Sequence, residues 1–84
     1  MRLNILCEDS KIAAAREKAK AITGESVLNI PVSKDGKEPA THWFCSLEVN
    51  EEGQKKILDL QEHSVIEEGG PKDFLKKWSL KIIK

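Results

Sequence analysis

Apolar and polar residues alternate near the start of the chain, and this period-two pattern predicts a β-strand over residues 3–7. Leu3, Ile5 and Cys7 then share the face expected to be buried. Residues 41–49 show the same alternation more clearly. One face of this second stretch carries Trp43, Cys45, Leu47 and Val49, and the other carries His42, Phe44, Ser46 and Glu48. We expect both stretches to be central strands of a sheet.

Spacings of three and four follow the first strand and predict an amphipathic helix over residues 12–22. Its apolar positions are Ile12, Ala15, Ala19 and Ile22. Asp9 or Ser10 is expected to cap its N-terminus, and Gly24 suits a left-handed cap at its C-terminus. The two alanines make the apolar stripe narrow, so this helix is expected to lie close against the sheet.

Two further helices are predicted in the second half of the chain. Asn50 is a good N-terminal cap for a helix that runs to about His63. Its buried positions are expected to be Ile57, Leu58 and Leu60. Gly69-Gly70 then interrupts the chain, and Pro71 suits the first position of a short helix. Phe74, Leu75 and Trp78 are the apolar residues of this short helix.

The remaining strands are less regular. Residues 27–32 alternate, and Pro31 within them predicts an edge strand because proline cannot donate to a ladder. The turn-rich segment 34–40 is expected to connect this strand to the next as a hairpin. Residues 64–66 are compatible with either a short strand or a loop, and Leu80 and Ile82 alternate in a final strand.

The predicted order of elements is β-α-β-β-α-(α)-β, in one domain that spans residues 1–84. This order matches the α+β class and the ferredoxin-like split β-α-β sandwich. That plan has a four-stranded antiparallel sheet, here with two main helices and a short third one. Its second and last strands lie at the edges. Matching the plan implies no function, because this architecture hosts many unrelated activities.

Composition and charge narrow the classes of partner. No apolar stretch is long enough to span a bilayer, and the N-terminal segment becomes acidic before any signal-peptide core, so we expect a cytoplasmic protein without a membrane partner. Fourteen basic and fourteen acidic residues cancel, which argues against nucleic acid. The charge is segregated, however: residues 48–68 hold seven acids against two lysines, and residues 71–84 hold five lysines against Asp73. Such patches either guide association or are a solvated surface.

The two cysteines are expected to be reduced core residues. Cys7 precedes a predicted helix, where the helix dipole favours a thiolate, but it alternates with apolar residues and is followed by two acids that disfavour the thiolate. Cys45 shares its face with Trp43 and Leu47. No pair of close cysteine and histidine ligands provides a zinc site, so no metal and no cofactor is expected.

No motif specifies catalysis. His42 and Cys45 are three apart on a strand and therefore face opposite sides, which excludes a nucleophile–base pair between them. His63 is expected to interact with the end of its helix. Gly69-Gly70 lacks the lysine and hydroxyl residue of a phosphate-binding loop and follows two glutamates. We therefore expect a binding domain rather than an enzyme.

A sheet with helices on one side leaves its other face open. On that face we expect a surface formed by Leu6, Val27, His42, Phe44 and Ile83. These residues are too apolar as a group to remain in water, so we expect the face to pair two copies of the chain or to bind a protein partner. A competing hypothesis is that the 34–40 loop or residues 64–70 cover Phe44 within one chain. An alternative function is a small-molecule-binding or minor enzymatic domain that uses the same face with His42.

Overall fold

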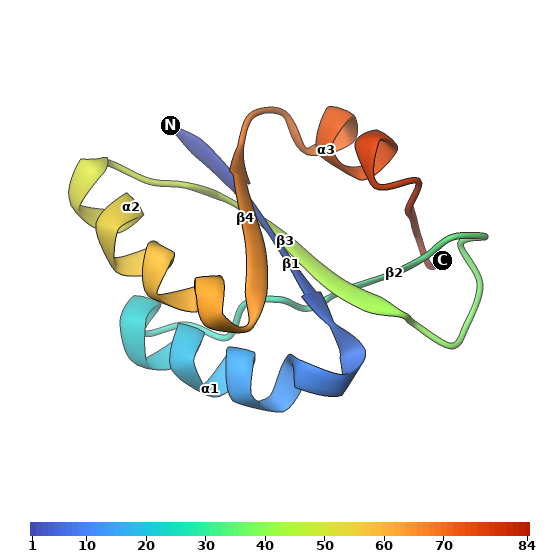
Figure 1. Ribbon diagram of the computed structural model, residues 1–84, viewed down its shortest axis with the longest axis horizontal. Helices are drawn as coiled ribbons and strands as arrows, with labels where there is room; N and C mark the ends of the chain where they lie inside the picture. The colour runs from blue at the N-terminus through green and yellow to red at the C-terminus, as the bar shows by residue number, and fades with distance from the viewer.

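The computed structural model describes residues 1–84 and has an α+β fold with a five-stranded antiparallel sheet. The elements are β1 (Arg2–Glu8), the 3-10 helix η1 (Asp9–Lys11), α1 (Ile12–Thr23), β2 (Ile30–Ser33), β3 (His42–Glu48), α2 (Glu51–Ile57), the 3-10 helix η2 (Leu58–Glu62), β4 (Ser64–Glu68), α3 (Pro71–Lys77) and β5 (Lys81–Ile82). The strand order is β4-β1-β3-β2-β5. Figure 1 shows α1 and α2 on one side of the sheet and α3 on the other.

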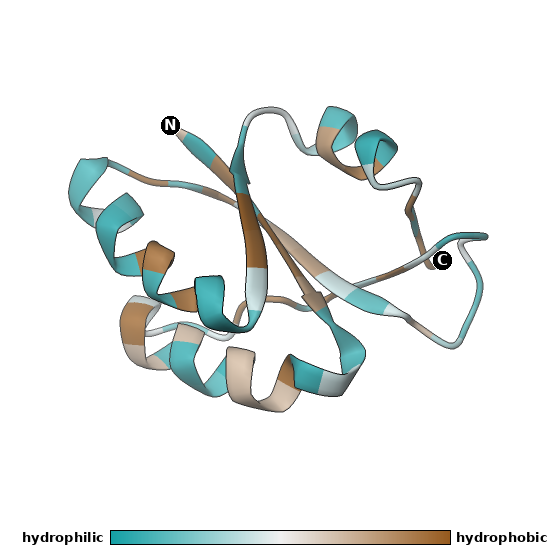
Figure 2. Cartoon of the chain, viewed as in Figure 1, coloured by the Kyte–Doolittle hydropathy of each residue, from teal (hydrophilic) through white to brown (hydrophobic).

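The two clearest predicted strands are the centre of the sheet, as expected. β1 pairs with β3 over its whole length, with Leu3 opposite Leu47 and Ile5 opposite Cys45. Five consecutive residues of β1, from Leu3 to Cys7, are buried because helices cover both faces of the sheet. The hydrophobic colour in Figure 2 accordingly runs along the strands, whereas the helices carry it only in places.

The predicted inner face is confirmed as the first core, between the sheet and α1, α2 and η2. Its buried members are Leu3, Ile5, Cys7, Ala15, Ala19, Val27, Leu28, Cys45, Ile57 and Leu60. Ala15 and Ala19 are fully buried, so the narrow alanine stripe brings α1 close to the strands. Gly24 caps α1 in the left-handed conformation, and its N–H donates to the Lys20 carbonyl.

The predicted cap of α1 by Asp9 or Ser10 is wrong. These residues form η1, and Lys11 at the N-cap position makes no side-chain capping bond. The carboxylate of Asp9 instead accepts a hydrogen bond of 2.8 Å from Trp43 Nε1 on β3. A tertiary contact thus replaces the local cap. The predicted cap of α2 is confirmed, because the Asn50 side chain accepts a hydrogen bond from the Gly53 N–H.

The second strand is shorter than expected and is not at an edge. β2 covers only Ile30–Ser33, because Leu28 adopts a left-handed conformation that interrupts the extended chain. The Arg16 guanidinium donates to the Leu28 carbonyl over 3.1 and 3.3 Å and holds this bend. β5 then pairs with the outer side of β2, and the Pro31 carbonyl accepts a hydrogen bond from the Ile83 N–H.

The expected four-stranded sheet is corrected to five strands. The ambiguous residues 64–66 belong to β4, which pairs with β1 and forms one edge of the sheet. The final predicted strand exists as β5 and forms the other edge. Both segments are strands because each pairs with a different open side of the sheet.

A second core lies between the sheet and α3, on the face that was expected to be open. Its buried residues are Leu6, Val32, Phe44, Phe74, Leu75 and Leu80. The rings of Phe44 and Phe74 are stacked with their centroids 5.7 Å apart. The expectation of an open sheet face is therefore wrong, and neither of the segments considered as covers is the one that covers Phe44.

Candidate functional site

The five residues expected to form one interaction surface are dispersed. Leu6 and Phe44 are 3% and 2% exposed beneath α3, and Val27 is buried in the first core on the opposite face of the sheet. His42 and Ile83 remain partly exposed but line different hollows. The alternation of β1 and β3 correctly predicted that Leu6 and Phe44 share a face. It did not show that the apolar residues of the short third helix would cover that face.

Both cysteines are free and buried, as expected. Burial raises the pKa of Cys7, whose thiol donates weakly to the backbone carbonyls of Glu8 and His63 at 3.4 and 3.3 Å. Burial also raises the pKa of Cys45, to about 11. Burial therefore disfavours the thiolate form at both positions.

A small cleft brings together the two histidines. It has a volume of about 290 Å³ and lies where β1 ends and where β3 and β4 begin. Its lining residues are Leu6, Glu8, Lys11, His42, Gln61, Glu62, His63, Ser64, Val65 and Trp78. His42 Nδ1 lies 2.9 Å from the Thr41 hydroxyl, which fixes the orientation of this ring. We name this hollow the histidine cleft.

The histidine cleft combines groups from three strands, two 3-10 helices and the end of α3. The sequence could not indicate this grouping, because His42 and His63 are twenty-one positions apart and were each considered alone. No group of three histidine, cysteine, aspartate or glutamate side chains in the chain is arranged to hold a metal ion. The cleft is lined by hydrogen-bonding side chains and by the ring of Trp78.

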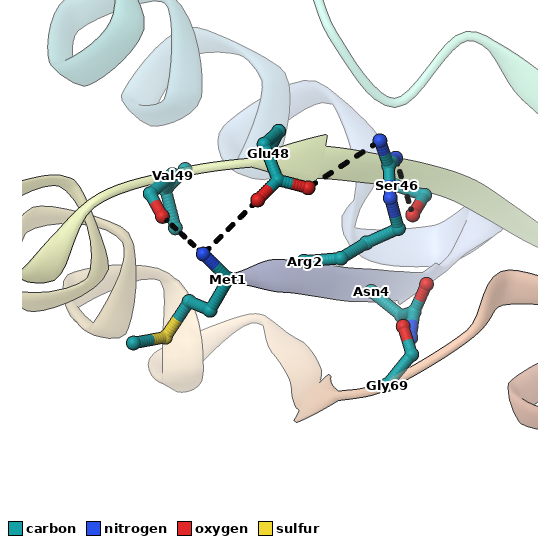
Figure 3. A network of polar contacts seen from close by, with 7 residues as sticks. All are labelled: Met1, Arg2, Asn4, Ser46, Glu48, Val49 and Gly69. Atoms are coloured by element: carbon teal, nitrogen blue, oxygen red, sulfur yellow. Dashed lines mark hydrogen bonds and ion pairs between the residues drawn. The ribbon is translucent and has the colours of Figure 1, made fainter.

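A polar network at the opposite end of β1 joins the ends of neighbouring strands (Figure 3). The Met1 amino group lies 3.0 Å from the Glu48 carboxylate, and the Arg2 guanidinium lies 3.5 Å from the same carboxylate. Asn4 is fully buried and donates to the Gly69 carbonyl over 3.0 Å, while its Oδ1 has no hydrogen-bond partner. The bonds of this network join β1 to β3 and to the turn after β4. The network therefore holds the sheet together.

β4 is an edge strand, and its pairing with β1 determines which of its backbone groups point outward. The Gly69 N–H donates to the Arg2 carbonyl over 3.1 Å. Because bonded and non-bonded pairs alternate along an antiparallel ladder, Glu67 and Val65 also bond to β1. The backbone groups of Ser64, Ile66 and Glu68 therefore point away from the sheet.

Exposed apolar side chains gather beside this open edge. Val65 is 37% exposed, and Trp78 at the end of α3 is 40% exposed. Both line the histidine cleft, so they lie near each other on the α3 face of the sheet. Glu67 on the same face accepts hydrogen bonds from Lys77 Nζ at 2.6 Å and Trp78 Nε1 at 3.3 Å. These bonds fasten α3 to β4.

Comparison with family models, curated proteins and solved structures finds no match. Function therefore has to be argued from the sites themselves. None of the helices is both long and apolar enough to cross a lipid bilayer. The open edge of β4 and the histidine cleft lie next to each other on this side of the protein.

Proposed function

We propose that the chain is a non-enzymatic interaction domain that forms a homodimer by pairing the β4 edges of two copies. The observation that carries this proposal is the open edge of β4, which has exposed Val65 and Trp78 beside it. Proteins usually protect an edge strand with charged side chains, especially lysine, with proline, with a bulge or by keeping the strand very short. The charged residues of β4 are Glu67, which is bonded to α3, and Glu68. β4 has five residues and contains neither lysine nor proline, whereas β5 at the other edge has two residues, one of them Lys81.

The phase of the ladder selects a register for this pairing. In an antiparallel pair related by a two-fold axis, Ile66 of one copy lies opposite Ile66 of the other, and Ser64 lies opposite Glu68. All three residues have outward-pointing backbone groups. The same register places Val65 opposite Glu67 of the second copy, where it meets the ring of Trp78 that is bonded to that glutamate. The exposed apolar side chains of each copy then cover those of the other.

Charge supports the same register. Glu67 and Glu68 lie opposite Val65 and Ser64, so neither glutamate faces its own counterpart. A shift of the pairing toward Gly69 would place Glu67 opposite Glu67, and like charges directly opposite each other destabilise a strand pair. An edge contact of this kind belongs with small interfaces, so we expect association in the micromolar range.

Sedimentation velocity over a range of concentrations tests the proposal. The wild type is expected to shift from monomer to dimer below about 0.5 mM. Val65→Glu places a charge opposite Glu67 of the second copy and should keep the protein monomeric, with an unchanged melting temperature because Val65 is already exposed. Glu68→Pro, which removes an outward N–H, should act in the same way.

Ile82→Glu is the matched control, since it places the same charge on an exposed apolar residue of the opposite edge. This variant should dimerise like the wild type. A wild type that stays monomeric at about 0.5 mM, or a dimer that survives Val65→Glu and is lost with Ile82→Glu, contradicts pairing through β4.

A small-molecule-binding domain is the second candidate function. The observation in its favour is that His42 and His63 line one cleft with Glu8 and Trp78. Its test is a nuclear magnetic resonance screen with a library of small aromatic and heterocyclic fragments. Binding predicts shifts of the imidazole resonances of His42 and His63, and shifts confined to other parts of the protein would exclude this site.

Two further points of the proposal concern the fold plan and the location of the protein. We infer that β1 to β4 with α1 and α2 follow the ferredoxin-like plan, which the order β4-β1-β3-β2 supports. The α3–β5 segment is then an addition that covers the second face. Two free, buried cysteines support a reducing, cytoplasmic location.

A further inference from the structure

A wide groove lies at the far side of the molecule from β4, between α3, β5 and the turn that follows β2. Its volume is about 750 Å³. Five lysines line it, and we call it the lysine groove: Lys34, Lys72, Lys76, Lys81 and Lys84. Leu75, Leu80 and Ile82 are the apolar residues of its lining, and Asp35 is its one carboxylate.

The walls of the lysine groove are well supported. Lys72, Leu75 and Lys76 are three and four positions apart, so they lie on one face of α3. Lys81 is held by the pairing of β5 with Ser33 of β2. Gly36 in the turn comes so close that a Cβ atom there would lie 3.2 Å from the Lys81 Cβ. The side chains of Lys72, Lys76 and Lys81 therefore start from well-supported backbone positions.

The turn itself is held by buried Ser33. Its hydroxyl donates to the Asp35 carboxylate at 3.0 Å and accepts from the Lys37 N–H at 3.0 Å. The Lys37 N–H also donates to the Asp35 carboxylate. The bonds that this carboxylate accepts from the Lys37 N–H and from the Ser33 hydroxyl lower the pKa of Asp35. Asp35 thus holds the turn, and it also lies near enough to Lys81 for that ammonium group to lower its pKa further.

The five lysines of the groove form no ion pair. The ion pairs of the protein join Glu48 to Met1 and Arg2, Glu62 to Lys18, Glu52 to Lys56, and Glu67 to Lys77. Lys77 on α3 is thus neutralised, while its neighbours Lys72 and Lys76 on the groove side are not. Five ammonium groups around one hollow, opposed by the Asp35 carboxylate near Lys81, create a net positive potential, although the whole chain has no net charge.

We propose that the lysine groove binds an acidic peptide segment of a partner protein, with its carboxylates at the lysines and an apolar side chain against Ile82. The exposed side chain of Ile82 favours a ligand that carries an apolar side chain as well as carboxylates. Ile82 is 45% exposed, the most of any large hydrophobic residue in the chain. A nucleic-acid backbone would satisfy the lysines but would bring phosphates to Ile82, and the groove has no aromatic side chain for base stacking.

This site is independent of the proposed dimer. The lysine groove adjoins β5 and the dimer contact uses β4, and these are the two opposite edges of the sheet. Loss of one interaction therefore leaves the other testable. A monomeric protein that binds the peptide, or a dimer that does not, separates failure of the two proposals.

Fluorescence anisotropy with a labelled peptide of alternating glutamate and leucine tests the inference. The wild type should bind it, with an affinity that falls as salt is raised. Lys72→Glu combined with Lys76→Glu should weaken binding by about tenfold or more, because it reverses two charges on one wall of the groove. Lys20→Glu combined with Lys55→Glu is the matched control, since both lysines are exposed and lie outside the groove. It changes the net charge equally and should leave binding within about twofold.

Three results would overturn the inference. One is the absence of binding by the wild type at low salt, and another is equal weakening by both double variants, which would show a response to net charge alone. The third is tighter, groove-dependent binding of a single-stranded oligothymidylate or of phosphatidylserine vesicles than of the peptide. That result would assign the groove to nucleic acid or to a membrane surface instead.

Discussion

Side chains in this protein often serve contacts that their sequence neighbours do not reveal. Asp9 follows a strand and resembles a helix cap, yet it accepts from Trp43. The ring of Trp43 also lies 4.4 Å beneath the Arg16 guanidinium, which in turn donates to the carbonyl of left-handed Leu28. These four residues join β3, η1, α1 and the loop before β2, so a change in one of them affects several elements.

Glu67 provides a prediction at this scale. Its hydrogen bonds, chiefly that from Lys77, lower its pKa. A carboxyl whose folded-state pKa is depressed contributes stability above its unfolded pKa of about 4.3, and that contribution is lost as pH falls through the folded value. Glu67→Gln should therefore lower the melting temperature at neutral pH. The difference from the wild type should shrink steadily below about pH 4.

Thermal unfolding followed by circular dichroism at dilute, monomeric concentration measures this difference. Glu68→Gln is the matched control on the same strand, because Glu68 forms no side-chain hydrogen bond or ion pair with α3. Its effect on the melting temperature should be small and independent of pH. A difference for Glu67→Gln that stays constant down to about pH 3 would show that the bonds to α3 do not stabilise the fold.

At the scale of elements, α3 is the segment whose role changed most between sequence and structure. It is a short helix with Phe74 and Leu75 on its buried side, and Pro71 begins it as predicted. In isolation α3 would be only marginally stable, because helices of this length depend on packing for their stability. The sheet supplies that packing through Phe44 and Leu6, and α3 in return removes an apolar face from water.

The contact between Phe44 and Phe74 can be measured by a double-mutant cycle. Phe44→Leu and Phe74→Leu should each destabilise the protein, and together they should cost less than the sum of the two. The coupling energy is expected to be about 0.5–1.5 kcal/mol, as for other stacked aromatic pairs. Urea unfolding of the four proteins gives this value.

Phe44→Leu combined with Ile22→Val on α1 is the control cycle, because Ile22 packs against the first core on the other side of the sheet. Its coupling should be within about 0.5 kcal/mol of zero. Equal coupling in the two cycles would mean that the two cores respond as one, and no coupling in the first would mean that α3 is not held by this stack.

At the scale of the whole molecule, one sheet separates two cores. α1, α2 and η2 enclose the first core, and α3 encloses the second. α2, whose two glutamates are balanced by two lysines, lies near the left end of Figure 1, and the C-terminus lies near the right end. The two sheet edges differ in length and charge, because β4 has five residues with Glu67 and Glu68, and β5 has two residues with Lys81.

The sequence by itself determined the elements whose pattern is local. The alternation of β1 and β3, the spacing in α1, the Asn50 cap and the Gly24 cap were all readable, because each depends on neighbours within a few residues. The burial of both cysteines was readable for the same reason. Only the tertiary structure decided what covers the second face of the sheet. An apolar face specifies that it must be covered, but α3 reaches Phe44 from thirty positions away.

The tertiary structure also determined which strands lie next to each other in the sheet. The segments that became β4 and β5 are short, and their pairing energy comes from whichever strand they meet rather than from their own residues. The histidine cleft and the lysine groove exist only because these pairings bring distant segments to one end of the sheet. Local pattern thus determined the strands and helices at the centre of the fold, while long-range packing determined its edges, where both proposed contacts lie.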